Sequence, residues 1–241
     1  MLAIHPLKIL IILLLLYIVG QIVYSGYYFF KARSLLGIKH NQNFESSDKS
    51  KPDFRMYING DSVATGVGAT SFETTFPGLL SQYLSQKYHV VLKNDSKAGN
   101  KMADLAASFP QEKQNLIVVI IASNDLLRFS PFGEFTRSTQ TVLDKYSELS
   151  EKVIIIGPGG VHRAPVMPIF MRPIYNWRAK KYISIIDGVA KKHPNITYLN
   201  STNIPHNFRP NPNQARSVDS FHPGDEGHRL FFELIKSTFN L

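Results

Sequence analysis

The hydrophobic positions begin with one long run near the N-terminus. Residues 9–19 are all apolar, and the run continues to residue 30 with only Gln21 and Ser25 as mild polar interruptions. At a rise of 1.5 Å per residue, about 22 helical residues cross a hydrocarbon core of roughly 30 Å. The pattern therefore predicts a single transmembrane helix within residues 1–33, which makes the chain a single-pass membrane protein.

A cleaved signal peptide is the alternative for this segment. Its apolar region is usually about 7–15 residues long and ends in an Ala-x-Ala-like site, which is absent here, so we favour an uncleaved anchor. Lys8 precedes the run, and Lys31, Arg33 and Lys39 follow it. This distribution is balanced and does not fix the orientation. The short N-terminal tail favours a catalytic domain outside the cytoplasm.

Polar residues dominate 34–53, which we interpret as a flexible stalk. From residue 54 onward, short apolar runs alternate with longer segments whose apolar residues recur at helical spacing. The runs predict strands at residues 55–60, 89–94, 116–121, 153–156 and 196–199. The helical segments are expected at residues 76–88, 102–108, 135–149 and 174–192, with a last helix ending near residue 239.

The alternation of strands and helices favours a parallel sheet with helices on both faces. The run at 116–121 is continuously apolar, as expected for a strand that is buried on both faces. We therefore predict an α/β domain over residues 54–241, with a three-layer α/β/α arrangement around five parallel strands.

Composition narrows the possible functions. The chain has no cysteine, which excludes disulfides, thiolate metal sites and a cysteine nucleophile. The net charge of +9 is divided between the N-terminal 51 residues (six Lys/Arg, two acids) and the rest (21 Lys/Arg, 16 acids). This spread, without a long basic run, argues against a nucleic-acid partner. Gly66-Val67-Gly68 lacks the third glycine of a dinucleotide-binding loop.

Polar residues follow the predicted strands, and the carboxyl ends of parallel strands share one edge of the sheet, where such proteins bind ligands. Each residue also has an ordinary interpretation as a turn, a cap or a loop. Together they supply a nucleophile, a base, an orienting acid and two donors, which indicates an active site. They are Ser62, Gly99, Asn124, Asp219 and His222.

The motifs around these residues resemble those of the SGNH (GDSL) hydrolases, in the same order. They are Gly60-Asp61-Ser62, Gly99, Asn124-Asp125 and Asp219-Ser220-Phe221-His222-Pro223. The resemblance covers about residues 54–241 and implies the flavodoxin-like fold of that family. One position departs from the pattern, because Ala122 stands where the third motif usually has glycine. The Gly-x-Ser-x-Gly elbow of the α/β-hydrolases is also absent, since Ala64 replaces its second glycine.

The resemblance implies an ester hydrolase that works through an acyl-serine, without a metal or cofactor. Ser62 is the expected nucleophile, His222 its base, and Asp219 the acid that orients the imidazole. The expected oxyanion donors are the backbone N–H groups of Ser62 and Gly99 and the side-chain amide of Asn124. The histidines do not form a known metal-ligand spacing.

Two further acids have structural interpretations. We expect Asp61 to bond backbone near the serine and Asp125 to cap the loop that positions Asn124.

The segment 161–175 is unusually apolar for a loop, as are the residues after Asn124. It either packs in the core, dips into the bilayer, or forms an acyl-binding wall. The candidate substrate-binding residues are Leu126, Phe129, Val161 and Met167.

The substrate expected from these patterns is a lipid or acyl ester. The family also includes enzymes that deacetylate polysaccharides, so an O-acetylated cell-wall or surface glycan is the alternative. A binding protein that kept the fold without turnover is a third possibility. The sequence does not indicate the oligomeric state.

Overall fold

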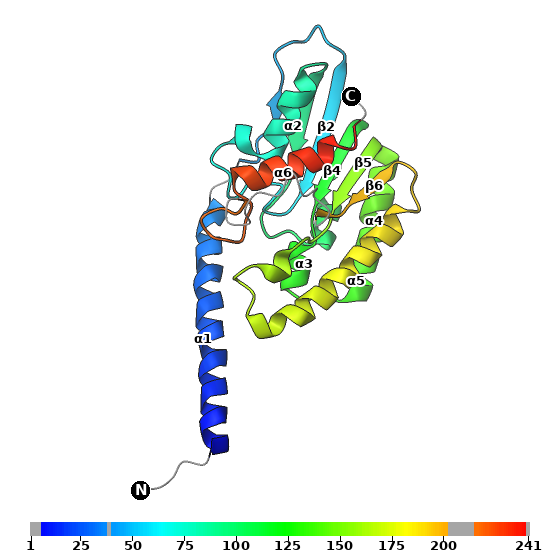
Figure 1. Ribbon diagram of the computed structural model, residues 1–241. Helices are drawn as coiled ribbons and strands as arrows, with labels where there is room; N and C mark the ends of the chain where they lie inside the picture. The colour runs from blue at the N-terminus through cyan, green and yellow to red at the C-terminus, as the bar shows by residue number, and fades with distance from the viewer. Residues whose placement is uncertain (1–5, 38–39, 202–214, 240–241) are drawn as a thin grey trace.

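A long N-terminal helix, α1 (Pro6–Ser34), extends from an α/β domain (Figure 1). The structure is a computed structural model, and it describes residues 6–37, 40–201 and 215–239. Most side chains of α1 are exposed, including the leucines and isoleucines of its first half. The predicted helix is therefore present, and it is long and apolar enough to cross a membrane.

The centre of the domain is a six-stranded sheet. Its strands are β1 (Phe44–Glu45), β2 (Asp53–Gly60), β3 (His89–Asn94), β4 (Gln114–Ile120), β5 (Ser150–Ile156) and β6 (Ile196–Leu199). Their order across the sheet is β1-β3-β2-β4-β5-β6, and every pair is parallel except β1 with β3. The five predicted parallel strands are confirmed.

Helices cover both faces of this sheet, which confirms the three-layer arrangement (Figure 1). The helices of the domain are α2 (Phe76–Ser85), α3 (Ser123–Leu127), α4 (Phe132–Leu149), α5 (Arg172–Ala190) and α6 (Asp225–Lys236). Short 3₁₀ turns follow α1 at Leu35–Gly37 and occur in the domain at Phe72–Thr74, Met102–Ala107, Val161–Arg163 and Ile169–Met171. The α-helix expected at 102–108 is thus a 3₁₀ turn, and the short helix α3 was not expected.

Alternate residues of the central strands pack into two separate cores. Tyr57 of β2 points to the core under α4 and α5, whereas Met56 and Ile58 point to the core under α2 and α6. The strands β4 and β5 divide in the same way and are almost fully buried. Because both faces need apolar side chains, these strands are apolar runs without a polar alternation.

The sheet has one strand more than predicted, and the flexible stalk expected at 34–53 is wrong for its middle part. The segment around β1 lies along the outer edge of β3. Ser46 accepts a hydrogen bond from the backbone of Val90 at its Oγ (2.8 Å), and the Asn43 Oδ1 accepts one from the backbone of Asn94 (3.0 Å). An edge strand leaves its backbone donors unpaired, so polar side chains that satisfy them hold this segment in place.

His228 joins α6 to the start of α2. It is fully buried, its ring stacks on Phe76, and its Nδ1 accepts the backbone N–H of Phe76 (3.5 Å). Burial lowers the pKa of His228 from 6.5 to about 4, since the charged ring loses its hydration. The folded protein therefore holds this histidine neutral.

This burial predicts a loss of stability in mild acid. The unfolded chain binds a proton near pH 6.5, whereas the folded chain does so only near pH 4, so the contribution of His228 falls as the pH drops through this range. The free energy of unfolding should decrease by up to about 3 kcal/mol through this residue. Urea unfolding at pH 7 and pH 4.5 measures it, and His228→Gln should reduce the difference between the two pH values. An unchanged difference in the variant would contradict the assignment.

Candidate active site

The end of β2 places Ser62 at the carboxyl edge of the sheet. Gly60 is required there, because a Cβ would lie 2.2 Å from the carbonyl oxygen of Ile120 on β4. The next residue, Asp61, is fully buried, donates its backbone N–H to the same carbonyl (3.0 Å), and accepts the N–H of Val63 at Oδ1 (3.0 Å). Burial raises the pKa of Asp61 to about 6. The side chain thus bonds backbone near Ser62, as the sequence predicted.

Ser62, His222 and Asp219 form a continuous chain of hydrogen bonds. The Oγ of Ser62 lies 3.0 Å from the Nε2 of His222, and the Nδ1 of His222 lies 2.6 Å from the Oδ2 of Asp219. All three side chains are buried. The structure therefore brings together the three residues that the sequence singled out, in the order that their predicted roles of nucleophile, base and orienting acid require.

The second oxygen of Asp219 is held by three donors. Its Oδ1 accepts the hydroxyl of Ser217 (2.6 Å) and the backbone N–H groups of Phe221 and His222 (2.9 Å each). Burial opposes ionisation of this carboxyl, but the hydrogen bonds from His222 and Ser217 outweigh it and lower the pKa of Asp219 to about 2. An ionised Asp219 accepts a hydrogen bond from the Nδ1–H of His222. The Nε2 of the neutral ring then has a lone pair that can accept the proton of Ser62.

Hydrogen bonds of Asn100 link the loops that carry Gly99 and Asn124. Gly99 has a φ of +92°, a conformation that favours glycine. The side chain of Asn100 donates to the carbonyl of Gly60 (3.2 Å), and the amide of Asn124 donates to the carbonyl of Asn100 (3.1 Å). Asn124 retains a second amide N–H. These bonds tie the loops after β3 and β4 to the end of β2.

Asp125 has a role close to the predicted one. Its Oδ2 accepts the backbone N–H of Met102 (2.8 Å), which fixes the start of α3 against the loop after β3. The residue before α3, Ala122, has a φ of +83°. This left-handed conformation explains why the related motif usually has glycine there.

A cleft of about 330 Å³ opens beside the hydrogen-bonded chain, between the loops that follow β5 and precede α6. Val63 and Phe221, which neighbour Ser62 and His222, line it together with Val161, Leu230 and Phe231. Its walls are mainly apolar.

Of the predicted substrate-binding residues, only Val161 lines this cleft. Leu126 is fully buried in the core under α4 and α5, so its prediction as a pocket residue is wrong. Met167 is buried in a small cluster with Ala164 and Val166, and Phe129 is exposed and packs against Tyr175. Leu126 and Phe129 follow a site residue in the chain, but the α3 turn directs them away from it.

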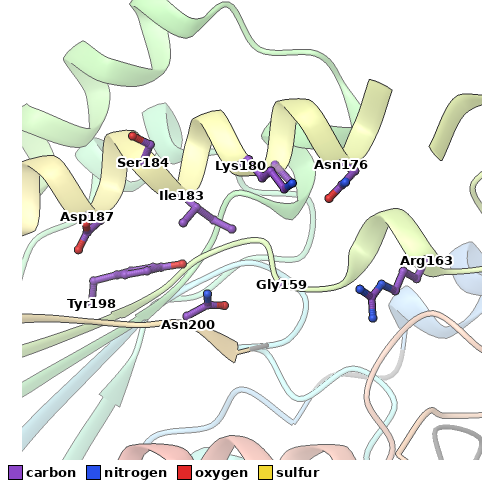
Figure 2. Close-up of a pocket in the computed structure, with 10 residues that line it drawn as sticks. Gly159, Arg163, Asn176, Lys180, Ile183, Ser184, Asp187, Tyr198 and Asn200 are labelled. Atoms are coloured by element: carbon purple, nitrogen blue, oxygen red, sulfur yellow. The ribbon is translucent and has the colours of Figure 1, made fainter. Parts of the chain in front are cut away.

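A second cavity, of about 650 Å³, lies between α5 and the strand β6 (Figure 2). Polar side chains line it: Asn176, Lys180 and Asp187 from α5, Tyr198 from β6, Arg163 from the turn after β5, and Asn200 directly after β6. Gly159 borders both cavities. Sequence patterns gave no sign of this cavity, because its residues come from segments far apart in the chain.

A second Asp-x-x-His pair, Asp225 and His228, has the same spacing as the pair at the site. Its aspartate accepts hydrogen bonds from Thr70 and Thr74, and its histidine is the buried residue that contacts Phe76. Spacing alone does not distinguish the two pairs, but contact with Ser62 does. Within the ranges that the structure describes, no group of histidine and acidic side chains is arranged for a metal ion.

Residues 58–230 match the model of the GDSL-like lipase/acylhydrolase family. The chain belongs to this family. It is therefore a hydrolase of the ester-cleaving type, and Ser62, Asp219 and His222 all lie within the matched residues. No protein with a curated description matches the sequence.

Several solved structures of this fold are similar to the chain. They include LAE5, an alpha/beta hydrolase enzyme from the metagenome of Lake Arreo, with 17% identity and a TM-score of 0.61. The matched region covers 78% of this chain and 95% of the LAE5 chain. A catalytic mutant of Axe2, an acetylxylan esterase from Geobacillus stearothermophilus, has 14% identity and a TM-score of 0.62 over 78% and 94% of the two chains. TesA has 19% identity and a TM-score of 0.60 over 77% and 98%. These likenesses confirm the GDSL hydrolase fold.

Gly68 packs closely against the loop that carries His222. Its φ is +96°, and a Cβ would lie 2.3 Å from the carbonyl oxygen of Pro223 and 3.1 Å from the Cβ of His222. Gly68→Ala should therefore displace the loop that carries His222 and destabilise the fold by about 2–5 kcal/mol. Chemical unfolding measures the loss, and ester hydrolysis should fall with it.

Gly188 is the matched control. It lies on the exposed side of α5, and a Cβ there meets no atom within 4 Å. Gly188→Ala should stabilise the protein by about 1 kcal/mol through helix propensity, with unchanged activity. Equal effects of the two substitutions would contradict the account of Gly68.

Proposed function

We propose that this protein is a membrane-anchored serine esterase that cleaves carboxylic esters through an acyl-serine intermediate. The observation that carries the proposal is the hydrogen-bonded chain from Ser62 through His222 to Asp219. His222 takes the proton of the Ser62 hydroxyl as Oγ attacks the ester carbonyl, and returns it to the leaving alcohol. Water then cleaves the acyl-serine by the same proton path.

The oxyanion of each tetrahedral intermediate needs donors close to Ser62. We assign this role to the backbone N–H groups of Ser62 and Gly99 and to the free amide N–H of Asn124. The support is the positive φ of Gly99 and the hydrogen bonds of Asn100, which fix these groups beside the end of β2. Loss of one such donor typically costs about 2.7–4 kcal/mol of barrier.

The variants of a relative support the assignment of the triad. Solved structures of Axe2 include three described as catalytic mutants, in which a serine, an aspartate and a histidine are each replaced by alanine. The aspartate and histidine of Axe2 are three residues apart in its chain. Asp219 and His222 have the same spacing here.

The cleft beside His222 favours an acyl or lipid ester as the substrate. Val161, Phe221, Leu230 and Phe231 give it an apolar wall, and burial of a hydrocarbon chain is favourable at about 0.8 kcal/mol per CH₂ group. We therefore place the acyl group in this cleft.

A deacetylase of O-acetylated polysaccharides is the second candidate. The larger cavity beside the cleft is lined by amides and charges, which suit a sugar (Figure 2). Axe2, which has the same fold, is an acetylxylan esterase. An acetyl group leaves most of the apolar cleft empty, so we rank this candidate below a lipid ester.

The helix α1 supplies the membrane anchor in this proposal. Residues 1–33 form the anchor, and residues 54–241 form the hydrolase domain, which we place outside the cytoplasm. The support for the anchor is the exposed apolar surface of α1. Within the segment between them, β1 pairs with β3.

Kinetics of single and double variants test the triad. Ser62→Ala and His222→Ala should each lower kcat by several orders of magnitude, and the double variant should be no worse than either, because the pair acts as one unit. Asp219→Ala should retain about tenfold to a hundredfold more activity than these, since it only orients the base. Hydrolysis of p-nitrophenyl acetate in detergent measures all four variants.

Ser85→Ala is the matched control for removal of a hydroxyl. The Oγ of Ser85 bonds only the helix carbonyl of Ser81 (2.7 Å), so activity should not change. Additive losses in the Ser62/His222 double variant would contradict a shared role. An inactive wild type would favour a binding protein with the same fold.

The acyl preference is tested with p-nitrophenyl esters of increasing chain length beside an acetylated xylan. The apolar cleft predicts that kcat/KM rises from acetate toward medium-length chains. Val161→Asp should remove most of this rise, because it introduces a charge into the acyl site, and should leave the acetate rate within about threefold. A constant rate for all chain lengths together with faster hydrolysis of the xylan would favour the deacetylase.

A further inference from the structure

Exposed apolar side chains gather at one end of the domain. Outside α1, the described residues expose few large hydrophobic side chains, and most of these belong to one group, which we call the apolar patch. Its members are Phe129, Ile169, Phe170, Ile174 and Trp177. Aromatic contacts connect the segment around Phe129 to the start of α5. Phe129 packs against Tyr175 (5.1 Å between ring centres), and Trp177 packs against Phe132 (5.6 Å). A grouped apolar surface of this kind marks a contact with another apolar body.

The patch lies beside the middle of α1. The backbone N–H of Ile169 donates to the side-chain Oε1 of Gln21 (3.3 Å). Closer to the end of α1, Tyr28 packs against the cluster of Ala164, Val166 and Met167. Figure 1 shows the start of α5 at the level of the central turns of α1, well below its junction with the domain.

This position fixes the depth of the patch relative to the apolar run of α1. Gln21 precedes Phe30, the last residue of that run, by nine positions, which is about 13 Å along a helix. The hydrocarbon core is roughly 30 Å thick, so Ile169 is level with the middle of the run. If α1 spans the membrane, the patch lies within the apolar layer beside it.

The chemistry around the patch suits a lipid environment. A backbone donor inside the hydrocarbon must be satisfied within the protein, and the otherwise isolated polar Gln21 does this for Ile169. Residues 160–181 contain no acid. Of their cations, Arg178 is satisfied within the protein, because its guanidinium donates to the carbonyl of Ser130 and the hydroxyl of Tyr182 (2.6 Å each).

The patch is also connected to the cleft beside His222, because Tyr175 packs both against Phe129 and against the cluster of Ala164, Val166 and Met167. The cluster of Ala164, Val166 and Met167 touches Tyr28 of α1, Val161 of the cleft, and Phe221, the residue before His222. The cleft therefore lies near the end of the apolar run, where the ester groups of membrane lipids are found, while the patch lies deeper, among their acyl chains.

We propose that the apolar patch inserts into the bilayer beside α1 and that the cleft draws its substrate, a lipid ester, directly from that membrane. The substrate half of this inference rests on the proposed esterase function. The insertion half does not, since it depends only on α1 and the patch.

Trp177 reports the insertion directly, because it is the only tryptophan of the chain and half of it is exposed. The full-length protein is reconstituted in vesicles of phosphatidylcholine and phosphatidylglycerol, with or without bromine atoms on the acyl chains, and flotation verifies its association. Insertion predicts a blue-shifted emission that brominated chains quench by at least half.

The matched control moves the tryptophan to the opposite end of the sheet. Tyr88 precedes β3 and packs against Phe54 near the start of β2. The variant Trp177→Phe with Tyr88→Trp should not be quenched in the same vesicles. Quenching of Trp177 no greater than that of this control would overturn the insertion.

Kinetics test the substrate half. Phe170→Glu with Ile174→Glu should lower hydrolysis of a vesicle-borne lipid ester at least tenfold, and should leave the rate for a water-soluble ester within twofold. Val91→Glu, at an exposed apolar position on β3, should change neither rate. An unchanged rate on vesicles in the patch variant, or a wild type that cleaves soluble but not vesicle-borne esters, would overturn this half.

Failure of the esterase proposal and failure of the membrane insertion give different experimental results. A protein whose Trp177 is quenched but which cleaves neither soluble nor vesicle-borne esters keeps the membrane insertion and loses the proposed function. A protein that is quenched and cleaves only acetylated glycans is a membrane-seated deacetylase, which would overturn the lipid substrate.

Discussion

The hydrogen bond between Ser62 and His222 joins the first strand of the hydrolase domain to the segment before its last helix. It connects residues 160 positions apart in the chain, so it forms only when the whole domain is folded. Asp225, at the start of α6, supports the same junction, since it accepts hydrogen bonds from Thr70 (2.8 Å) and Thr74 (2.7 Å), which follow Ser62 in the chain. The site is therefore a property of the fold and not of one loop.

The parallel sheet supplies the second constraint, because its carboxyl edge collects the ends of β2, β3 and β4 in one place. The same edge faces the side of the domain from which α1 extends (Figure 1). A parallel sheet thus determines both where Ser62 lies and which end of the domain is next to α1. The small cluster of Ala164, Val166 and Met167 connects the two, since it contacts α1 and the loop of His222 together.

Much of this arrangement follows from the sequence, because local patterns determine it. The strands are apolar runs, and the site residues stand in motifs of a few neighbouring residues that follow these runs. The sequence failed where an ordinary polar side chain makes a specific contact, or where a short helix changes the direction of an apolar side chain. Asn43 and Ser46 have the composition of a flexible linker, yet they complete the edge of β3. Ser217 binds Asp219 but is an ordinary loop serine in the sequence. Leu126 follows a site residue in the chain, but the turn of α3 places it in the core.

The central claim is that Ser62 is a nucleophile activated by His222. A fluorophosphonate, which reacts with an activated serine, tests it most directly on the detergent-solubilised full-length protein. Intact mass and peptide mapping should find one phosphonyl group per chain, on Ser62, with loss of ester hydrolysis in proportion to labelling. The His222→Ala variant should remain unlabelled over the same time. Label on another residue, or hydrolysis that persists when Ser62 is fully labelled, would contradict the account.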